Sequence, residues 1–474
     1  MISAMSWVPR GAAAANPVKY EPSGEELEQL RAVEEQESLA LMAVGSNPRD
    51  LPADLDMNHY DDDDNAMDAD EAEDDPYITN PAEMDSDGED AEEDMTIKES
   101  DAVLLVCKSD EDYSCLEVYV YDEEEGNLYV HHEIGLKAFP LCISWIGHNP
   151  ETRGSGNFAA VGTFRPDIEI WNLDVVDVLE PTVQLGGAIG QHDGGLVGGG
   201  ALKSGSHTEA VMSLSWNLHQ KHVLASGSAD TTVKLWDIAA GSCLMTSHHH
   251  SDKVQAVQWH PLEQTVIITG GFDKNVCLMD VRQTSLAAKC ATDADVEMLQ
   301  WNPHNAAQFA VSTENGKVTL YDARNCTAPV FTLQAHDKPV SSISFSCMVP
   351  GFFGTMSIDK TVKLWDMGSG SPSCLSTKSM GVGDLLCGGF FMNDPFLMAV
   401  GGSNGQVAIW ETSENSVVER TFSSRVKNMP TVVFDPSAED SFVLAKPSDE
   451  EAVAALGASS SPGKKKKKRK KKKQ

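Results

Sequence analysis

Short stretches in which apolar and polar residues alternate recur along most of the chain, and one pattern dominates them. It consists of an aliphatic residue, any residue, a second aliphatic residue, an aromatic residue or Met, and an acidic residue or Asn. Its seven copies are Val118–Asp122, Ile168–Asn172, Val233–Asp237, Val276–Asp280, Val318–Asp322, Val362–Asp366 and Val407–Glu411. The last five copies end 43, 42, 44 and 45 residues apart. Alternation with a period of two predicts β-strands.

A second pattern places an aliphatic residue two positions before an aromatic residue. Its copies are Ile143/Trp145, Leu214/Trp216, Val257/Trp259, Leu299/Trp301, Ile343/Phe345, Val432/Phe434 and a degraded Gly388/Phe390. In five repeats this aromatic residue precedes the fourth residue of the first pattern by 20 positions, as Trp216 precedes Trp236. A repeat of 40–45 residues with four strand-sized segments and a Trp-Asp end is typical of WD-repeat β-propellers.

These repeats predict an all-β chain that forms a seven-bladed WD-repeat β-propeller over residues 100–446, with a disordered acidic N-terminal arm and a basic C-terminal tail. Val118–Asp122 has no aromatic strand of the second pattern before it, and Val432–Phe434 has no copy of the first pattern after it. We therefore expect these two strands to share one blade and to close the ring, which removes exposed sheet edges. Val103–Val106 and Phe442–Leu444 both qualify as the second strand of that blade.

Four polar residues in a repeat are spaced so that they can form one buried chain of hydrogen bonds. An Asp would orient a His, the imidazole would meet a hydroxyl, and the hydroxyl would meet an indole N–H. The complete sets are His207, Ser226, Asp230 and Trp236, and His336, Thr355, Asp359 and Trp365. A third set, which begins at His250, has Met279 in the place of Trp. Because the arrangement recurs in each repeat, we interpret it as a structural tetrad and not as a hydrolase triad.

The N-terminal 99 residues predict three segments outside the propeller. Residues 1–20 surround Trp7, Val8, Pro9 and Arg10 with no helix or strand pattern, and we interpret them as a partner-docking segment because Trp is enriched at binding hot spots. Residues 21–45 begin near a capping box and are expected to form an amphipathic helix. Residues 46–99 are expected to be a disordered linker, since positions 50–95 contain 21 acids and no Lys or Arg.

The charge of the chain is strongly negative, with a formal net value of −36, and this excludes a simple basic nucleic-acid-binding protein. Residues 447–474 form a predicted disordered tail that contains ten consecutive bases. Its first seven, Lys464, Lys465, Lys466, Lys467, Lys468, Arg469 and Lys470, are a candidate nuclear or nucleolar targeting signal, and the tail could also bind the phosphates of rRNA. Ser86 lies among acids and is a possible phosphorylation site.

Other chemistry finds little support in the sequence. Gly401-x-Ser403-x-Gly405 matches the nucleophile elbow of hydrolases, but Val407–Trp410 predicts a strand where the elbow needs a helix. We expect no enzymatic activity, no cofactor, no metal, no small-molecule substrate and no membrane association. The ten cysteines include no Cys-x-x-Cys pair and are expected to be thiols.

The chain resembles the periodic tryptophan protein 1 family. The resemblance rests on the start Met1-Ile-Ser-Ala-Met-Ser-Trp-Val-Pro-Arg-Gly11, the acidic stretch with Asp74-Asp-Pro-Tyr-Ile78, seven WD repeats and a Lys-rich end. The resemblance implies a nucleolar protein associated with assembly of the large ribosomal subunit, pre-rRNA processing and ribosomal DNA chromatin.

The sequence therefore predicts a non-enzymatic nucleolar scaffold that binds proteins of pre-ribosomal particles. Residues 100–463 carry a net charge of −22, which favours basic partners such as ribosomal proteins. One alternative is a chromatin module that holds histone tails. Another is a cullin-ligase substrate receptor, because Met279–Arg282 and Tyr321–Arg324 resemble the W-D-x-R box, although neither contains its Trp.

Overall fold

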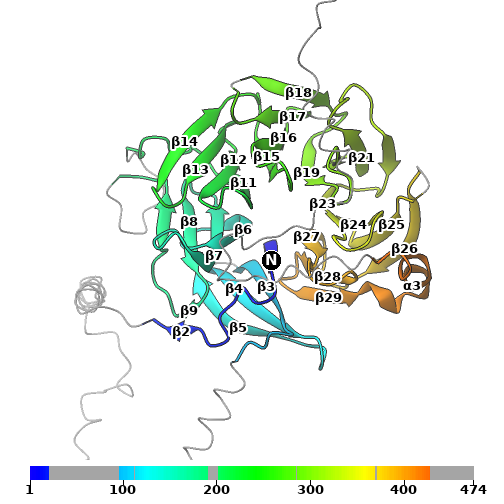
Figure 1. Cartoon of the computed structure of the whole chain (residues 1–474), viewed down its shortest axis with the longest axis horizontal. Helices are drawn as coiled ribbons and strands as arrows, with labels where there is room; N and C mark the ends of the chain where they lie inside the picture. The colour runs from blue at the N-terminus through cyan, green and yellow to red at the C-terminus, as the bar shows by residue number, and fades with distance from the viewer. Residues whose placement is uncertain (21–95, 111–112, 190–200, 284, 369–370, 427–474) are drawn as a thin grey trace, which may run out of the picture. The chain divides into compact units, whose positions relative to one another are not determined.

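The computed structural model describes residues 1–20, 96–110, 113–189, 201–283, 285–368 and 371–426. Strands in these residues form six antiparallel sheets of four strands and one of three, together with a separate two-stranded sheet. The seven larger sheets are arranged as blades in a ring, with the first strand of each blade innermost (Figure 1). The predicted seven-bladed β-propeller is therefore confirmed.

The first four blades follow one another in sequence, each beginning with its innermost strand. Blade 1 contains β1 (Ile2–Val8), β3 (Ala102–Asp110), β4 (Tyr113–Asp122) and β5 (Asn127–Gly135). Blade 2 contains β6 (Pro140–His148), β7 (Ser155–Thr163), β8 (Ile168–Asn172) and β10 (Val183–Leu185). Blade 3 contains β11 (Val211–Trp216), β12 (Val223–Ser228), β13 (Val233–Asp237) and β14 (Ser242–Ser247). Blade 4 contains β15 (Val254–Trp259), β16 (Val266–Gly271), β17 (Asn275–Asp280) and β18 (Leu286–Ala291).

The remaining blades complete the ring. Blade 5 contains β19 (Val296–Trp301), β20 (Gln308–Thr313), β21 (Lys317–Asp322) and β22 (Phe331–Gln334). Blade 6 contains β23 (Val340–Phe345), β24 (Phe352–Ser357), β25 (Thr361–Asp366) and β26 (Ser373–Ser379). In the described residues blade 7 contains β27 (Leu385–Phe390), β28 (Leu397–Gly402) and β29 (Val407–Glu411). Outside the blades lie β2 (Val18–Lys19), β9 (Val175–Val176), the 3₁₀-helix η3 (Thr412–Glu414) and the helix α3 (Ser416–Phe422).

The core of the propeller lies mainly between blades. The second strand of each blade is mostly buried, and β12, β24 and β28 are buried along their whole length, because neighbouring blades cover both of their faces. Buried clusters join each blade to the next. One of them combines Ile2, Trp7 and Leu104 of blade 1 with Leu397 and Ala399 of blade 7. Packing therefore continues around the ring and across the junction between the two ends of the sequence.

Blade 1 is completed by the N-terminus, which the sequence analysis placed outside the propeller. β1 pairs antiparallel with β3, and Trp7 lies opposite Leu104. Val103–Val106, one of the two segments considered for the second strand, lies within β3. The prediction that Val432–Phe434 fills the innermost position of this blade is wrong, because β1 occupies that position; Val432–Phe434 and Phe442–Leu444 lie outside the described residues. The two ends of the chain do not share a blade in the described structure.

The register of blade 1 differs by two residues from that of the other blades. Leu104 pairs with Trp7 on one side and with Tyr119 on the other. In blade 3 the equivalent Leu224 pairs with Trp216 and Trp236. Tyr119 therefore takes the place that the repeat pattern assigned to Tyr121.

Three further features qualify the sequence predictions. Cys290 of β18 and Cys326 form a disulfide with their Cα atoms 5.0 Å apart, so the expectation of ten thiols is wrong for this pair. Residues 21–95 and 427–474 are outside the described residues, and with them the predicted helix over 21–45, Ser86 and Lys464–Lys470. No helix in the described part of the chain is long and apolar enough to cross a membrane.

Candidate functional site on the tetrad face

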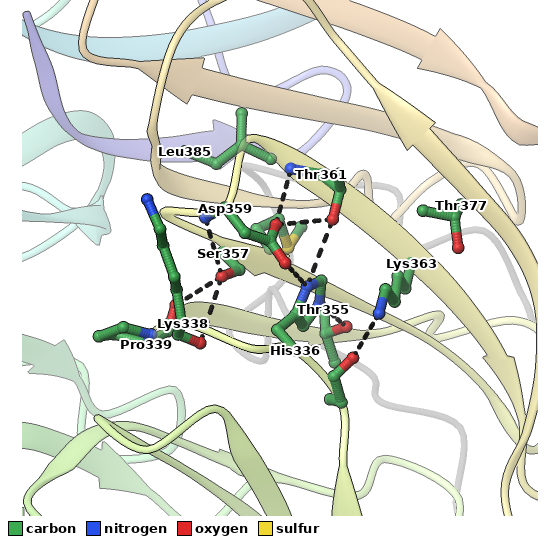
Figure 2. Close-up of polar contacts among 12 residues, drawn as sticks. His336, Lys338, Pro339, Thr355, Ser357, Asp359, Thr361, Lys363, Thr377 and Leu385 are labelled. Carbon is green, nitrogen blue, oxygen red and sulfur yellow. Dashed lines mark hydrogen bonds and ion pairs between the residues drawn. The ribbon is translucent and has the colours of Figure 1, made fainter.

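The buried polar side chains of blade 6 lie at one end of its strands, where two loops meet. Figure 2 shows His336, Thr355 and Asp359 pointing toward one another from the loop before β23, from β24 and from the β24–β25 turn. His336 Nδ1 lies 2.8 Å from Asp359 Oδ2, and His336 Nε2 lies 2.8 Å from Thr355 Oγ1. The indole N–H of Trp365 donates to the same Thr355 oxygen at 2.9 Å. The structure thus brings all four predicted residues into one hydrogen-bonded chain.

Blade 3 repeats this arrangement with a serine. His207 lies 2.8 Å from Asp230 Oδ2 and 2.7 Å from Ser226 Oγ, and Trp236 Nε1 donates to Ser226 Oγ at 2.8 Å. Asp230 accepts a hydrogen bond from Nδ1–H of His207. Nε2 of the neutral imidazole therefore accepts a hydrogen bond from the Ser226 hydroxyl. The hydroxyl oxygen then accepts from the indole, which satisfies every buried group in the chain.

Blade 4 contains a shortened version. His250 lies 3.0 Å from Asp273 Oδ1 and 2.8 Å from Thr269 Oγ1. Met279 pairs with Ile267 at the position where the other two blades carry the indole, and it cannot donate a hydrogen bond. Thr269 therefore forms a hydrogen bond with one member of its set, whereas Thr355 forms hydrogen bonds with two members of its tetrad. The three blades provide a natural comparison between complete and incomplete tetrads.

The sequence analysis missed two hydroxyl groups that enlarge each complete tetrad. In blade 6, Thr361 Oγ1 donates to Asp359 Oδ1 at 2.6 Å, and Ser357 Oγ donates to the Pro339 carbonyl at 2.8 Å (Figure 2). Thr232 and Ser228 occupy the same positions in blade 3. The signal was present in the sequence, because each hydroxyl residue lies two positions after a tetrad member. Side chains two apart in a strand lie on the same face.

The turn that holds each tetrad Asp is also fixed through its backbone. The residue after the Asp has a positive φ in all three blades, with values of 67° at Thr231, 59° at Lys274 and 73° at Lys360. This conformation costs a non-glycine residue roughly 1 kcal/mol. The carboxylate compensates by accepting the N–H two residues after it, as Asp359 does from Thr361 at 3.0 Å. The tetrad therefore holds the turn in one conformation.

Burial sets the protonation states of the tetrads. Desolvation lowers the pKa of His207, His250 and His336 below the ordinary value of 6.5, and the adjacent carboxylates only partly oppose this. Burial alone would raise the pKa of Asp230, Asp273 and Asp359, but the hydrogen bonds from His and their other donors lower it in each case. The folded protein therefore holds neutral imidazoles beside charged carboxylates near neutral pH.

We expect the propeller to lose stability as the pH falls below about 6.5. Above that pH the histidines are neutral in both states, whereas below it the unfolded histidines take up protons that the folded ones resist. Each histidine can contribute a slope of up to about 1.4 kcal/mol per pH unit. Buried carboxylates with a raised pKa, such as Glu169, oppose this loss, but among the described residues the six histidines whose pKa burial lowers outnumber the four such carboxylates. Below about pH 3.8 the depressed pKa of each Asp adds a second loss. Urea unfolding at pH 7.5, 6.5 and 5.5 measures the first effect, and greater stability at pH 5.5 than at pH 7.5 would contradict it.

In two blades without a tetrad, the Trp of the third strand has other partners. In blade 2 the indole N–H of Trp171 donates to Glu169 Oε2 at 3.3 Å. Burial, together with the nearby charge of Asp167, raises the pKa of Glu169 to about 7. In blade 7 the ring centre of Trp410 lies 4.5 Å from the ammonium group of Lys378, which β26 of blade 6 supplies. Among the described residues, complete tetrads therefore occur in blades 3 and 6.

The loops that carry the tetrads form one face of the ring, which we call the tetrad face; it includes residues 137–139, 164–167, 208–210, 229–232, 251–253, 272–274, 292–295, 314–316, 337–339 and 358–360. Its surface chemistry changes around the ring. On blade 2, Phe164 is 60% exposed and its ring centre lies 5.4 Å from that of Phe139. Burial raises the pKa of Glu297 on blade 5, and the charges of Glu314 and Asp295 raise it further. The face therefore offers separate aromatic and acidic surfaces on rigid loops.

The predicted docking residues hold blade 1 to blade 7. Trp7 is 8% exposed, its indole N–H donates to the Gly389 carbonyl at 3.0 Å, and its ring centre lies 4.8 Å from that of Phe391. The backbone N–H of Arg10 donates to Asn393 at 3.1 Å, and its guanidinium pairs with Glu123.

Val8 and Pro9 are buried beside them. The interpretation of residues 1–20 as a free docking segment is therefore wrong for Trp7, Val8, Pro9 and Arg10. Their side chains or backbone groups find partners in the propeller itself, so the local absence of a core at the N-terminus misled the prediction.

Two other candidate motifs are ordinary parts of the blades. Ser403 lies in the turn between β28 and β29, and its hydroxyl accepts the Asp384 N–H at 3.0 Å. A strand follows this turn, so the geometry of a nucleophile elbow is not formed there. Arg282 and Arg324 fold back onto Asp280 and Asp322, each with its closest N–O distance at 2.6 Å.

Seven blades of about 40 residues, with Trp-Asp ends and complete buried tetrads in blades 3 and 6, define a WD-repeat propeller. The family described as "WD domain, G-beta repeat" matches residues 202–237, and "MIOS, WD40 repeat" matches residues 220–381. The chain is also similar to a chain in the crystal structure of the mitotic checkpoint complex, with a TM-score of 0.50 over 66% of this chain and 83% of that chain. The two are 18% identical, so this likeness concerns the fold alone.

More similar relatives narrow the class to one family. The chain is 31% identical to periodic tryptophan protein 1 of Saccharomyces cerevisiae, over 90% of this chain and 91% of the relative. It is 31% identical to the Drosophila melanogaster homologue, over 71% and 73%. An uncharacterised WD-repeat protein of Schizosaccharomyces pombe is 44% identical over 74% of this chain and 69% of its own length. The chain belongs to the periodic tryptophan protein 1 family of WD-repeat proteins.

Proposed function

We propose that this protein is a non-enzymatic scaffold of ribosome biogenesis, which binds basic ribosomal proteins and assembly factors of the large-subunit precursor in the nucleolus. Family membership is the observation that carries the proposal. The architecture supports it, because rigid loops on a propeller present several surfaces at fixed angles. The net charge of −22 over residues 100–463 favours basic protein partners over naked RNA.

Affinity purification of the full chain, with and without nuclease, tests this proposal. We expect pre-ribosomal proteins to co-purify, and the protein to co-sediment with large-subunit precursors in a density gradient. Partners that remain after nuclease treatment bind through protein contacts, whereas partners that are lost depend on RNA. A protein that sediments apart from ribosomal precursors in both conditions would contradict the proposal.

A second candidate function is binding to histones in ribosomal DNA chromatin. The acidic residues Asp295, Glu297 and Glu314 on the tetrad face favour it, because they could receive a basic tail. Co-sedimentation separates the two functions, since the second places the protein with nucleosomes. The cullin-ligase alternative has less support, because Arg282 and Arg324 are already paired with carboxylates of their own chain.

Deletion of residues 464–473 should move the protein out of the nucleolus. These ten bases are the strongest positive segment of an otherwise acidic chain, and they match the composition of nuclear targeting segments. Deletion of residues 447–456, which has the same length and contains no Lys or Arg, is the matched control and should leave localisation unchanged. Fluorescence microscopy of tagged proteins decides the result. Nucleolar retention of the first variant would remove the targeting role.

A further inference from the structure

Three side chains that can bind a metal ion lie together on the two outer strands of blade 1. Cys115 and Glu117 are two residues apart on β4, so their side chains lie on the same face of the sheet. β5 runs antiparallel to β4 and places Glu133 directly opposite Glu117. The thiol sulfur and one oxygen of each carboxylate all lie within 4.8 Å of one another. Sequence spacing did not show this cluster, because the register of β5 supplies its third member.

The thiol of Cys115 is a buried group without a partner. The residue is 3% exposed, and its sulfur forms neither a disulfide nor a hydrogen bond with any residue that the structure describes. Burial, together with the charges of Glu117 and Glu133, raises the pKa of the thiol to about 12. A metal ion removes the proton of a thiol that coordinates it. A divalent cation at this place would therefore bond the sulfur and offset the negative charge around it.

The two carboxylates of the cluster carry more charge than the neighbouring ammonium group neutralises. Glu117 and Glu133 form a cross-strand pair of like charge, and such pairs destabilise a sheet. Lys108 Nζ donates to Glu117 Oε1 at 2.8 Å and offsets one of the two charges. Glu133 accepts a long hydrogen bond from the hydroxyl of Tyr113, at 3.4 Å. An excess negative charge therefore remains beside the buried thiol.

Glu117 is held in one orientation and can still coordinate an ion. The hydroxyl of Tyr119 donates to Glu117 Oε2 at 2.9 Å, while Lys108 bonds Oε1. An ionised carboxylate has about four lone-pair sites, so each oxygen keeps one for a metal ion. Hydrogen bonds of this kind orient the ligands of metal sites in proteins. Glu117 therefore has the support that a metal-binding carboxylate needs.

The cluster is accessible from the side of β5. Glu133 and Tyr113 are exposed. Gly135 lies opposite Cys115 and brings no side chain to the cluster. The atom nearest to the place of a Cβ at Gly135 is the hydroxyl oxygen of Tyr113, 3.8 Å away. An ion can therefore enter from solvent, and space remains for a water molecule as a further ligand.

We propose that Cys115, Glu117 and Glu133 bind one divalent cation of the zinc class, with water as the fourth ligand. A thiolate favours Zn²⁺ over Mg²⁺ and Ca²⁺, and Zn²⁺ also accepts carboxylate oxygens. Ligand atoms of a tetrahedral zinc site lie roughly 3.5 Å apart, so a small rotation of the exposed Glu133 side chain closes the cluster around the ion. The Cys115 sulfur bonds the ion and its proton passes to solvent. The inference does not depend on the proposed role in ribosome biogenesis.

Titration of the full chain with Cd²⁺, after removal of bound metal with a chelator, tests the proposal. Cd²⁺ prefers ligands similar to those of Zn²⁺, and its bond to a thiolate produces an ultraviolet absorption band that histidine and carboxylate ligands do not produce. The test variants are Cys115→Ser and Glu133→Gln. The matched controls are Cys374→Ser, at an exposed thiol of β26, and Glu124→Gln, at an exposed carboxylate in the turn after β4. Circular dichroism verifies that each variant is folded.

We expect the wild type and both controls to bind one Cd²⁺ through a thiolate, and Zn²⁺ but not Mg²⁺ to displace it. Cys115→Ser should lose the absorption band, and Glu133→Gln should weaken binding by about tenfold or more. A wild type without the band would overturn the proposal. An unchanged band in Cys115→Ser would also overturn it, because another thiol would then bind the ion. Unchanged affinity in Glu133→Gln would contradict the ligand set that we assign.

Discussion

Trp7→Ala is expected to destabilise the propeller by about 3–5 kcal/mol, the usual cost of removing a buried Trp side chain. The indole fills the junction between blades 1 and 7, where it contacts Phe391 and donates to the Gly389 carbonyl. No blade in the described structure is shared between the two ends of the chain. Side-chain packing and a few hydrogen bonds therefore hold the ring closed. Urea unfolding of the full chain measures the loss.

Two further variants separate closure from partner binding. Trp7→Phe keeps an aromatic ring at the junction but removes the indole N–H, so it should cost less than Trp7→Ala. Phe391→Ala removes the other ring, and the double variant should cost less than the sum of the single ones because both rings fill the same junction. An unchanged stability of Trp7→Ala with weaker binding to partners would restore the docking interpretation.

The sequence predicted the blades well because each blade buries the same positions. Inner-strand aromatic residues and third-strand Trp or its substitutes recur at 20-residue intervals, and the structure pairs Trp216 with Trp236 through Leu224. The tetrad positions follow the same repeat, so spacing alone placed His336 beside Asp359. Local strand periodicity thus carries most of the information about this fold.

Closure of the ring was harder to predict because it depends on contacts far apart in sequence. Met5 and Trp7 match the second pattern as well as Val432 and Phe434 do, but residues 9–101 separate β1 from β3. The 20-residue interval that identified other blades is absent there. The second pattern fixes only two positions, so it also matches other segments by chance. Only the pairing of β1 with β3 decides which segment is innermost in blade 1.

The shift of register in blade 1 has a similar cause. β4 is ten residues long and alternates over Tyr119–Asp122, and both Tyr119 and Tyr121 suit the position opposite Leu104. The sequence favoured Tyr121 because Asp122 follows it. The pairing of β3 with β4 places Tyr119 there instead, and its hydroxyl donates to Glu117 at 2.9 Å. A repeat signature therefore does not fix the register of a long strand that offers the same residue type two positions apart.

Thr355→Val is expected to destabilise the propeller more than Thr269→Val, although both remove one buried hydroxyl and keep the shape of the side chain. Thr355 bridges His336 and Trp365, so its loss leaves a buried acceptor and a buried donor without partners. Thr269 serves only His250 in its tetrad, because Met279 replaces the indole. Each unsatisfied group costs about 1–3 kcal/mol. The difference between the two variants should therefore be about 1 kcal/mol or more.

Urea unfolding of the two variants at pH 7.5 measures this difference directly. The comparison is well matched, because both threonines are 2% exposed or less and both lie on the second strand of a blade. A third variant, Met279→Trp, would restore the missing indole and should increase the cost of Thr269→Val toward that of Thr355→Val. Equal costs for the two original variants would show that the Trp365 hydrogen bond adds nothing. The tetrad would then stabilise the loops through His and Asp alone.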